Sequence, residues 1–343
     1  MNIRLGKTEI TPDSRSYIIA EACENHLGNM AIARETVLQA KLAGADAIKF
    51  QHHLPDEEML KGAPMSDNFD KDEPLYDFLK RCSLKLDQHA ELKALCEKVG
   101  IQYMCTPFSY AAAVDLLKID IDAFKIGSGE MTDIPSLQKI ASLGKPMLLS
   151  TGMCTFDEID ETYRALKATD IPFALFNCVS EYPPKYEDVN LRVLEEMRRR
   201  WPDVLIGHSD HTPDIYTCFA AVPLGARFLE KHVTLDKRSP GPDQSVSIDM
   251  RDLRELVDGV RKIEAALGAV KKVHDKERPI RTWAHRSVVS VKDIAAGAVI
   301  AEGMVWTKRP GTGIPSKDLP KVLGRKAKRA LPKDTILSWE DLA

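Results

Sequence analysis

Two histidines near the ends of apolar runs point to metal chemistry. His211 follows the run VLIGHS in LIGHSDHTPD, and His232 closes the next run, RFLEKHV. If these runs are neighbouring strands, their ends lie side by side. Two imidazoles could then bind one divalent cation, with the carboxylate of Glu21 nearby. A single histidine is more often structural, so the pairing of two histidines with the adjacent charged residues Asp210 and Lys231 favours a metal site. As residues at strand ends, Asp210 and Lys231 are expected to face the same pocket.

Two lysines stand inside apolar runs, where an unpaired charge would be costly. These are Lys49 in AIKFQ and Lys125 in AFKIGS. They could pair within the protein with Glu21 and Glu130, form a Schiff base, or bind an anionic ligand. Hydroxyl groups close to the ends of similar runs would add hydrogen-bond donors, namely Thr106, Ser128, Ser150 and Ser209. Two ammonium groups with these hydroxyls suit a small phosphorylated carboxylate.

The order of apolar runs and helical patterns indicates the fold that would gather these residues. Eight strand-like runs alternate with amphipathic helices, at 17–22, 47–51, 101–106, 123–128, 146–151, 173–178, 204–209 and 227–233. Eight such units predict an α/β protein built as a (β/α)8 TIM barrel, whose strand ends open onto one pocket. A doubly wound sheet is the alternative, but the glycine-rich first turn that it usually has is missing.

The chain divides into parts of different composition. We expect a barrel domain over residues 1–269, with a long insertion at 54–84 on the working face of the barrel. Residues 270–284 are charged, interrupt the alternation and are typical of a linker. Residues 285–343 contain short strands punctuated by glycine, which predicts a separate small, mainly β domain.

Composition excludes several other classes of protein. The 343 residues carry a formal net charge of −3, which gives no general attraction to nucleic acid or to an anionic membrane. No stretch approaches the roughly 20 apolar residues of a membrane helix, and the first residues lack the pattern of a signal peptide. The seven scattered cysteines are typical of reduced thiols. We expect a cytoplasmic protein whose partners are small molecules.

Several motifs together resemble one family. The stretches IIAEACENHLG, ADAIKFQ, CTPFS, FKIGSGE, LSTGM, GHSDHT, LEKHVTLD and PGPDQS are similar, in that order, to the sialic acid synthase family. The tail, from RSVVSVKDIAAGAVI through KRPGTG to LGRKAKR, resembles the antifreeze-like (SAF) domain that is fused to those synthases. The resemblance runs from about residue 16 to the C-terminus.

The resemblance implies a metal-dependent condensation of phosphoenolpyruvate with an N-acetylated hexose such as N-acetylmannosamine. The products would be a nine-carbon 3-deoxy-2-ulosonic acid and phosphate. By similarity, His211 and His232 hold the metal, which would be Mn²⁺ first, with Mg²⁺ or Co²⁺ as alternatives. The residues implied as catalytic are Glu21, Glu130, Lys49, Lys125 and Arg309. Those expected to bind substrate are Thr106, Ser128, Ser150, Ser180, Tyr182, Ser209, Asp243 and, from its place at the end of the second predicted strand, Gln51.

The same resemblance implies a domain-swapped homodimer, in which Arg309 of KRPGTG would reach the sugar site of the partner subunit. The sequence also departs from the family pattern. Leu27 stands in NHLG where the family often has a polar residue, and Ser180 replaces an asparagine on the phosphate side. These departures leave the sugar open.

Three alternatives therefore stand beside N-acetylmannosamine. A 2,4-diacetamido-6-deoxy hexose would give a legionaminate. A phosphorylated aldose would need further basic residues for the sugar phosphate, and the only free candidates for that role lie in 61–85 or in the tail. A non-catalytic, ice-binding module would need a flat face rich in threonine, and the basic tail does not fit that requirement.

Overall fold

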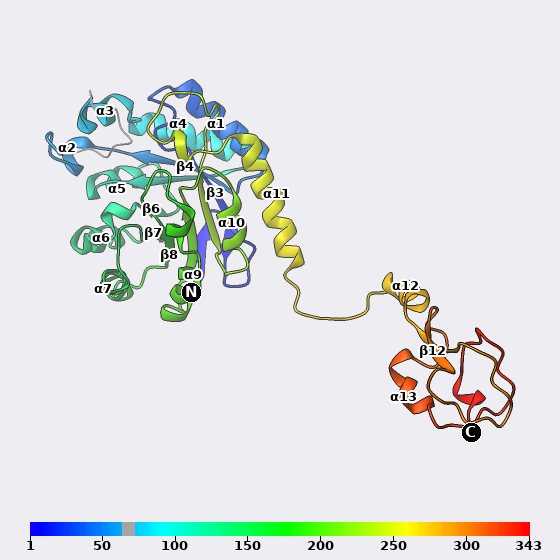
Figure 1. The fold of residues 1–343 in the computed structure, drawn as a ribbon. Helices are drawn as coiled ribbons and strands as arrows, with labels where there is room; N and C mark the ends of the chain where they lie inside the picture. The colour runs from blue at the N-terminus through cyan, green and yellow to red at the C-terminus, as the bar shows by residue number, and fades with distance from the viewer. Residues whose placement is uncertain (64–72) are drawn as a thin grey trace. The chain divides into compact units, whose positions relative to one another are not determined.

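Eight parallel strands close into a barrel in the computed structural model, which describes residues 1–63 and 73–343 (Figure 1). The strands follow one another in chain order, and the last pairs with the first to complete the closure. The predicted (β/α)8 barrel is confirmed. Its strands are β3 (Tyr17–Glu21), β4 (Ala47–His52), β5 (Gln102–Pro107), β6 (Phe124–Ile126), β7 (Met147–Ser150), β8 (Phe173–Cys178), β9 (Leu205–Asp210) and β10 (Phe228–His232).

Helices cover the outside of the barrel (Figure 1). The first of them, α1, shows how the sequence sets its ends: the Asn29 side chain accepts a hydrogen bond from the backbone N–H of Ala31, and Gly44 ends the helix at a φ of 93°. The helices of this layer are α1 (Met30–Ala43), α4 (Leu86–Val99), α5 (Tyr110–Leu117), α6 (Ile134–Ala141), α7 (Phe156–Lys167), α8 (Tyr186–Val189), α9 (Val193–Arg200), α10 (Tyr216–Ala221) and α11 (Met250–Ala266), with 3-10 turns η1 (Ser128–Glu130) and η2 (Gln244–Val246).

Alternation along the strands separates two apolar cores. Ile18 and Ile48 pack towards the helices, whereas Ile19 and Ala47 join the cluster inside the barrel. The residues that continue the inward row, Glu21 on β3 and Lys49 on β4, are polar, so the interior changes from apolar to charged near the carboxyl ends of the strands.

An N-terminal hairpin, which the sequence did not predict, belongs to the inner core. Its strands β1 (Ile3–Leu5) and β2 (Thr8–Ile10) are antiparallel, and Ile3, Leu5 and Ile10 lie in the same apolar cluster as the inward residues of the barrel strands. Strands of three residues are too short for a period of two to stand out in the sequence.

The insertion after β4 contributes two short helices, α2 (Pro55–Glu58) and α3 (Leu75–Cys82). Residues 64–72 of the predicted insertion lie outside the described residues. In the described part of the chain, no helix combines the length and the apolar character that crossing a membrane requires.

The chain separates into two compact units, Met1–Leu267 and Gly268–Ala343. The second unit is built on an antiparallel strand pair around its own apolar core. The linker predicted at 270–284 proves to be partly helical. Pro279 lies in the first turn of the helix formed there, where proline is tolerated. The elements are α12 (Glu277–Ala284), β11 (Ser287–Ser290), β12 (Val305–Lys308), η3 (Ser316–Asp318), α13 (Leu319–Val322) and η4 (Trp339–Asp341).

Candidate active site

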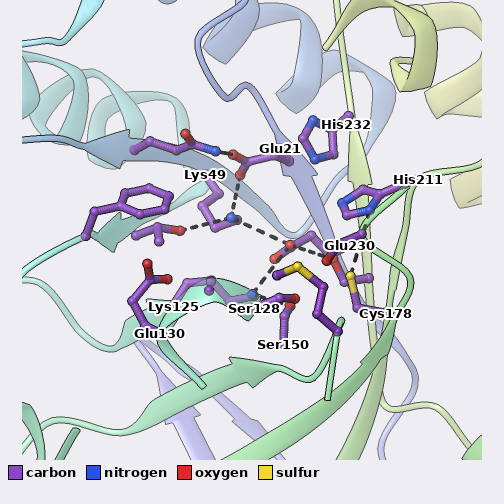
Figure 2. A pocket seen from close by; sticks show the side chains of 18 of the residues that line it. Glu21, Lys49, Lys125, Ser128, Glu130, Ser150, Cys178, His211, Glu230 and His232 are labelled. Carbon is purple, nitrogen blue, oxygen red and sulfur yellow. Dashed lines mark hydrogen bonds and ion pairs between the residues drawn. The ribbon is translucent and has the colours of Figure 1, made fainter. Parts of the chain in front are cut away.

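A cavity of about 260 Å³ opens where the barrel strands end (Figure 2). This is the end at which barrels of this kind carry their active sites. The cavity gathers all of the residues singled out from the sequence except Asp243 and Arg309. The singled-out residues that line it are Glu21, Lys49, Gln51, Thr106, Lys125, Ser128, Glu130, Ser150, Ser180, Tyr182, Ser209, His211 and His232.

Strand register explains why these side chains meet. In the closed barrel, His232 is level with Glu21, and Glu21 is level with Lys49 on the next strand. Residues that are level in a parallel ladder point to the same face. Three chemically different groups are thus brought into one row by residues far apart in the sequence.

The ammonium group of Lys49 is held by two carboxylates. Its Nζ lies 2.7 Å from Oε2 of Glu21 and 3.6 Å from Oε1 of Glu230, and it donates a hydrogen bond of 3.0 Å to Oγ1 of Thr106. The Gln51 side chain donates to the other oxygen of Glu21 at 2.8 Å.

Lys125 approaches the same Glu230 from the opposite side of the cavity (Figure 2). Its Nζ lies 3.7 Å from Oε1 of Glu230 and donates to Oγ of Ser150 at 2.6 Å. Ser209 donates to the same carboxylate oxygen at 3.0 Å. The internal pairing of the lysines considered from the sequence therefore exists with Glu21, but the second partner is Glu230 and not Glu130.

Glu230 was missed in the sequence although a signal for it was present. Because His232 points into the barrel, the period of two along β10 predicts that Glu230 does so as well. The same period corrects the interpretation of two neighbours. Asp210 and Lys231 were taken to face the pocket with the histidines, but they alternate out of it, and Nζ of Lys231 lies 2.8 Å from Oδ2 of Asp210 in a buried pair.

Burial and charge act in opposite directions on these groups. Burial raises the pKa of Glu21, and the nearby Lys49 only partly offsets it. Burial would also raise the pKa of Glu230, but the ammonium groups of Lys125 and Lys49 outweigh that effect and lower it. Burial lowers the pKa of Lys125, whereas in Lys49 the two carboxylates outweigh burial and raise the pKa. The charges of the two lysines are thus balanced by carboxylates of the same cavity.

Glu130 stands apart from this network. One of its carboxyl oxygens is buried without a hydrogen-bond partner among the described residues. Burial raises its pKa to about 7. A carboxyl group with such a pKa exchanges protons readily near neutral pH, which is a property of general acids and bases.

A second compartment of about 350 Å³ adjoins the first and shares Gln51, Phe108, Glu130, Ser180 and Tyr182 with it. Carboxylates and one histidine supply most of its polar groups. Helix α3 supplies apolar side chains, Leu75 and Leu79. No lysine or arginine of the described residues lines it. The residues particular to this compartment are Glu24, His53, Glu58, Met59, Leu75, Leu79, Pro242 and Asp243.

The two predicted metal ligands lie together. The rings of His211 and His232 meet edge to face, with centroids 5.1 Å apart, and Tyr182 stacks on His211 at 4.2 Å. Nδ1 of His211 is 2.6 Å from the carbonyl oxygen of Val179, whereas Nδ1 of His232 is buried without a hydrogen-bond partner among the described residues. Burial lowers the pKa of His232, which keeps it in the neutral form that binds metals. These histidines fit a divalent cation.

Arg309 lies in the second unit. It is exposed, and its guanidinium carbon is 5.4 Å from the ring centroid of Trp283 on α12. The expectation that Arg309 reaches the sugar site of the partner subunit stays a prediction.

Comparison with known proteins decides the family. A model described as the NeuB family matches residues 36–272, and an SAF domain model matches residues 285–343. The chain belongs to the NeuB family. The predicted relationship to sialic acid synthases, the enzyme class and the SAF domain are confirmed.

Named members of the NeuB family align with nearly the whole chain. The N,N'-diacetyllegionaminic acid synthase of Legionella pneumophila is 35% identical, covering 95% of this chain and 94% of that protein. The human N-acetylneuraminate-9-phosphate synthase is 33% identical, covering 94% and 92%. The crystal structure of the N-acetylneuraminic acid synthetase of Leptospira borgpetersenii, in complex with citrate, superposes with a TM-score of 0.73 at 29% identity, covering 82% of this chain and 95% of that one.

Proposed function

We propose that this enzyme condenses phosphoenolpyruvate with a neutral, N-acetylated hexose to give a nine-carbon 3-deoxy-2-ulosonic acid and phosphate. The observation that carries the proposal is the pairing of two compartments. One has two buried lysines among hydroxyl groups, and the other is lined by carboxylates, one histidine and apolar side chains, without a described lysine or arginine. A trianionic donor fits the first compartment and an uncharged acceptor fits the second.

Phosphoenolpyruvate, the donor, would bind to the two ammonium groups. Lys49 and Lys125 each carry a hydroxyl neighbour, Thr106 and Ser150, which can accept from the lysine while donating to a phosphate or carboxylate oxygen. Ser128 stands at a short helical turn, where its Oγ accepts a hydrogen bond of 3.0 Å from the backbone N–H of Gly152. Such preformed donors hold an anion with little reorganisation.

His211 and His232 would hold the divalent cation, for which Mn²⁺ is our first choice. When bound, this cation supplies Lewis acidity to the carbonyl oxygen of the acceptor. Tyr182 keeps the His211 ring in place by stacking, and the Val179 carbonyl leaves its Nε2 free to act as the ligand.

The carboxylates of the cavity would assist the formation of the carbon–carbon bond. C3 of phosphoenolpyruvate attacks the carbonyl carbon of the acceptor, and positive charge develops at C2. Glu21 and Glu230, which line the cavity beside the two lysines, would stabilise that charge. Water adds at C2 and gives a proton to Glu130 as general base, which passes it to the alkoxide left on the acceptor. Phosphate then leaves by cleavage of the C2–O bond and takes the proton of the C2 hydroxyl, so that C2 becomes the ketone.

The direct test is phosphate release from phosphoenolpyruvate with Mn²⁺ and a panel of acceptors. N-acetylmannosamine, its 6-phosphate and a 2,4-diacetamido-6-deoxy hexose are the informative members. We expect release with a neutral acceptor and none after removal of metal by a chelator. A preference for the 6-phosphate, or no release with any member, would refute the proposal.

The diacetamido sugar is a second candidate, and it would make the enzyme a legionaminate-type synthase. Met59, Leu75 and Leu79 give the acceptor compartment an apolar wall that an additional acetyl group and a methyl group in place of a hydroxymethyl group would contact. A higher kcat/KM for this sugar than for N-acetylmannosamine in the same assay would select it.

Catalysis should fall as the pH drops below about 7. Glu130 must be ionised to accept a proton, and its pKa of about 7 means that protonation removes the base below this pH. The pH profile of kcat should therefore have an acidic limb, and in Glu130→Gln the small remaining activity should lack it. Glu24→Gln is the matched control, because burial raises the pKa of Glu24 to about 7 as well. Loss of the limb in Glu24→Gln would contradict the assignment.

We also propose a domain-swapped homodimer in the cytoplasm. The seven cysteines are free in the structure, which supports a reducing compartment. Arg309 supports the swap only through its resemblance to the family motif and its exposure.

A further inference from the structure

We propose that Cys23 and Asp243 complete the metal site, so that the cation is bound by a thiolate and a carboxylate in addition to His232 and His211. This inference rests on the cation of the proposed function, and it changes the chemistry of its site. A site of two histidines leaves most positions to water and substrate. A Cys-His-His-Asp set supplies four protein ligands of mixed softness.

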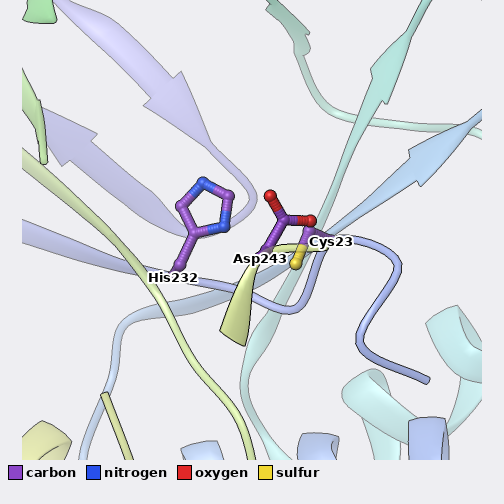
Figure 3. A group of neighbouring side chains, drawn as sticks. All are labelled: Cys23, His232 and Asp243. Atoms are coloured by element: carbon purple, nitrogen blue, oxygen red, sulfur yellow. The ribbon is translucent and has the colours of Figure 1, made fainter. Parts of the chain in front are cut away.

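The geometry of three side chains carries the inference (Figure 3). Ligand atoms of Cys23, His232 and Asp243 all lie within 4.8 Å of one another, and they come from three separate segments of the barrel mouth. Cys23 and His232 are buried, and Asp243 is half-buried. Three donors at this separation could converge on one ion with small side-chain movements.

A second observation points to a ligand at the same place. Nδ1 of His232 is buried without a hydrogen-bond partner in the described part of the chain. A buried imidazole nitrogen without a partner is costly unless something else satisfies the ring. A cation between the thiol and the carboxylate would bind the ring and account for its position.

Hydrogen bonds connect the three backbone segments that carry Cys23, His232 and Asp243. Nδ2 of Asn25 donates to the carbonyl oxygen of Val233 at 3.0 Å and to Oγ of Ser247 at 2.9 Å, and Ser247 in turn donates to the carbonyl oxygen of Asp243 at 2.7 Å. One asparagine thereby joins the turn that holds Cys23, the end of β10 after His232 and the loop that holds Asp243. Metal sites depend on such supporting contacts.

A second thiol near the histidines serves as the matched control. Sγ of Cys178 lies 3.8 Å from Nδ1 of His211, but that nitrogen is already 2.6 Å from the carbonyl oxygen of Val179. Cys178 therefore approaches the side of His211 that faces away from a ligating Nε2. Cys178 is thus a thiol near the histidines that lies outside the group of Cys23, His232 and Asp243.

The test uses Co²⁺ added to the metal-free, full-length protein without substrates. Co²⁺ bound by a thiolate gives a near-ultraviolet charge-transfer band. We expect this band in the wild type and in Cys178→Ser, and its loss in Cys23→Ser. Asp243→Asn should keep the band but weaken Co²⁺ binding by at least about tenfold. Loss of a residue that only supports a metal ligand already lowers metal affinity by about 10- to 100-fold, and loss of a direct ligand should cost no less.

Metal preference gives a second measurement. A thiolate favours Zn²⁺ and Co²⁺ over Mg²⁺ and Mn²⁺. Cys23→Ser should therefore lower the affinity for Zn²⁺ by tenfold or more, while the affinity for Mn²⁺ changes less. X-ray absorption of the Zn²⁺-loaded wild type should show sulfur in the coordination shell, which makes the test independent of whether the variant folds.

Three outcomes overturn the inference: no stoichiometric binding of Co²⁺, a bound ion without the band, or a band that survives Cys23→Ser and disappears in Cys178→Ser. None of these measurements uses phosphoenolpyruvate. Failure of the proposed function appears instead as absence of phosphate release, with the cobalt spectrum intact.

Discussion

Lys49→Met should lower kcat/KM for phosphoenolpyruvate by about 10- to 150-fold, because a hydrogen bond to a charged group contributes roughly 1.5–3 kcal/mol. Nζ of Lys49 sits in the donor compartment between Glu21 and Glu230, and methionine retains most of the volume without the charge. The loss should fall mainly on the KM for phosphoenolpyruvate, and the KM for the sugar should change little. Initial rates of phosphate release at varied donor concentration measure it.

Lys231→Met is the control for the general cost of losing a buried lysine. Lys231 is fully buried and paired with Asp210, but it faces out of the barrel. Removal of one partner of a buried pair typically costs 3–5 kcal/mol of stability, so both variants should unfold at lower denaturant concentration. Only Lys49→Met should change the KM for phosphoenolpyruvate. Equal effects of the two variants on this KM would show that Lys49 has a purely structural role.

Arg309→Ala should remove most of the activity if the guanidinium completes the sugar site of the partner subunit. Its planar fork of donors suits a polar sugar, and Arg309→Lys should not restore it. Arg325→Ala is the matched control. Arg325 is exposed in the same unit, with its guanidinium carbon 5.4 Å from the ring centroid of Trp339, as Arg309 is from that of Trp283. Arg325→Ala should retain wild-type rates.

Mixed dimers test whether Arg309 acts across subunits. Chains with Glu130→Gln and chains with Arg309→Ala are each expected to be nearly inactive. In a swapped dimer of one chain of each kind, one site carries both defects and the other carries neither. Random exchange makes about half of the dimers mixed, so about a quarter of the wild-type activity should return. If the mixture stays inactive after subunit exchange has been verified, Arg309 acts within its own chain.

The barrel was predictable because each of its strands contains a short apolar run between amphipathic helices. Lys49 and Lys125 were visible for the same reason, since a charge inside such a run stands out. Glu230 was overlooked because it is followed by Lys231 and resembles part of an ordinary charged pair. The period of two along β10 separates these two residues, and the register of β10 against β9, which places Glu230 level with Ser209, agrees with that period.

Other residues of the mouth could not have been found from local sequence. Cys23 looks like any small core residue, and its proposed role as a metal ligand depends on its closeness to Asp243, which is more than 200 positions away in the chain. Glu24 and Glu58 line the acceptor compartment because turns and the short helix α2 carry them there. Loop conformations of this kind follow from tertiary contacts and not from the periodicity of the sequence.

The pairing of lysines with carboxylates inside the cavity bears on whether donor binding takes protons from the solvent. Before a ligand arrives, Lys49 and Lys125 are balanced by Glu21 and Glu230 at 2.7 to 3.7 Å. A donor that forms ion pairs with both lysines places a new anion beside the buried carboxylates of Glu21 and Glu230. Because like charges disfavour ionisation, the affinity of these two carboxylates for protons rises. We therefore expect binding of phosphoenolpyruvate to be accompanied by proton uptake, so that its calorimetric heat should include the ionisation enthalpy of the buffer.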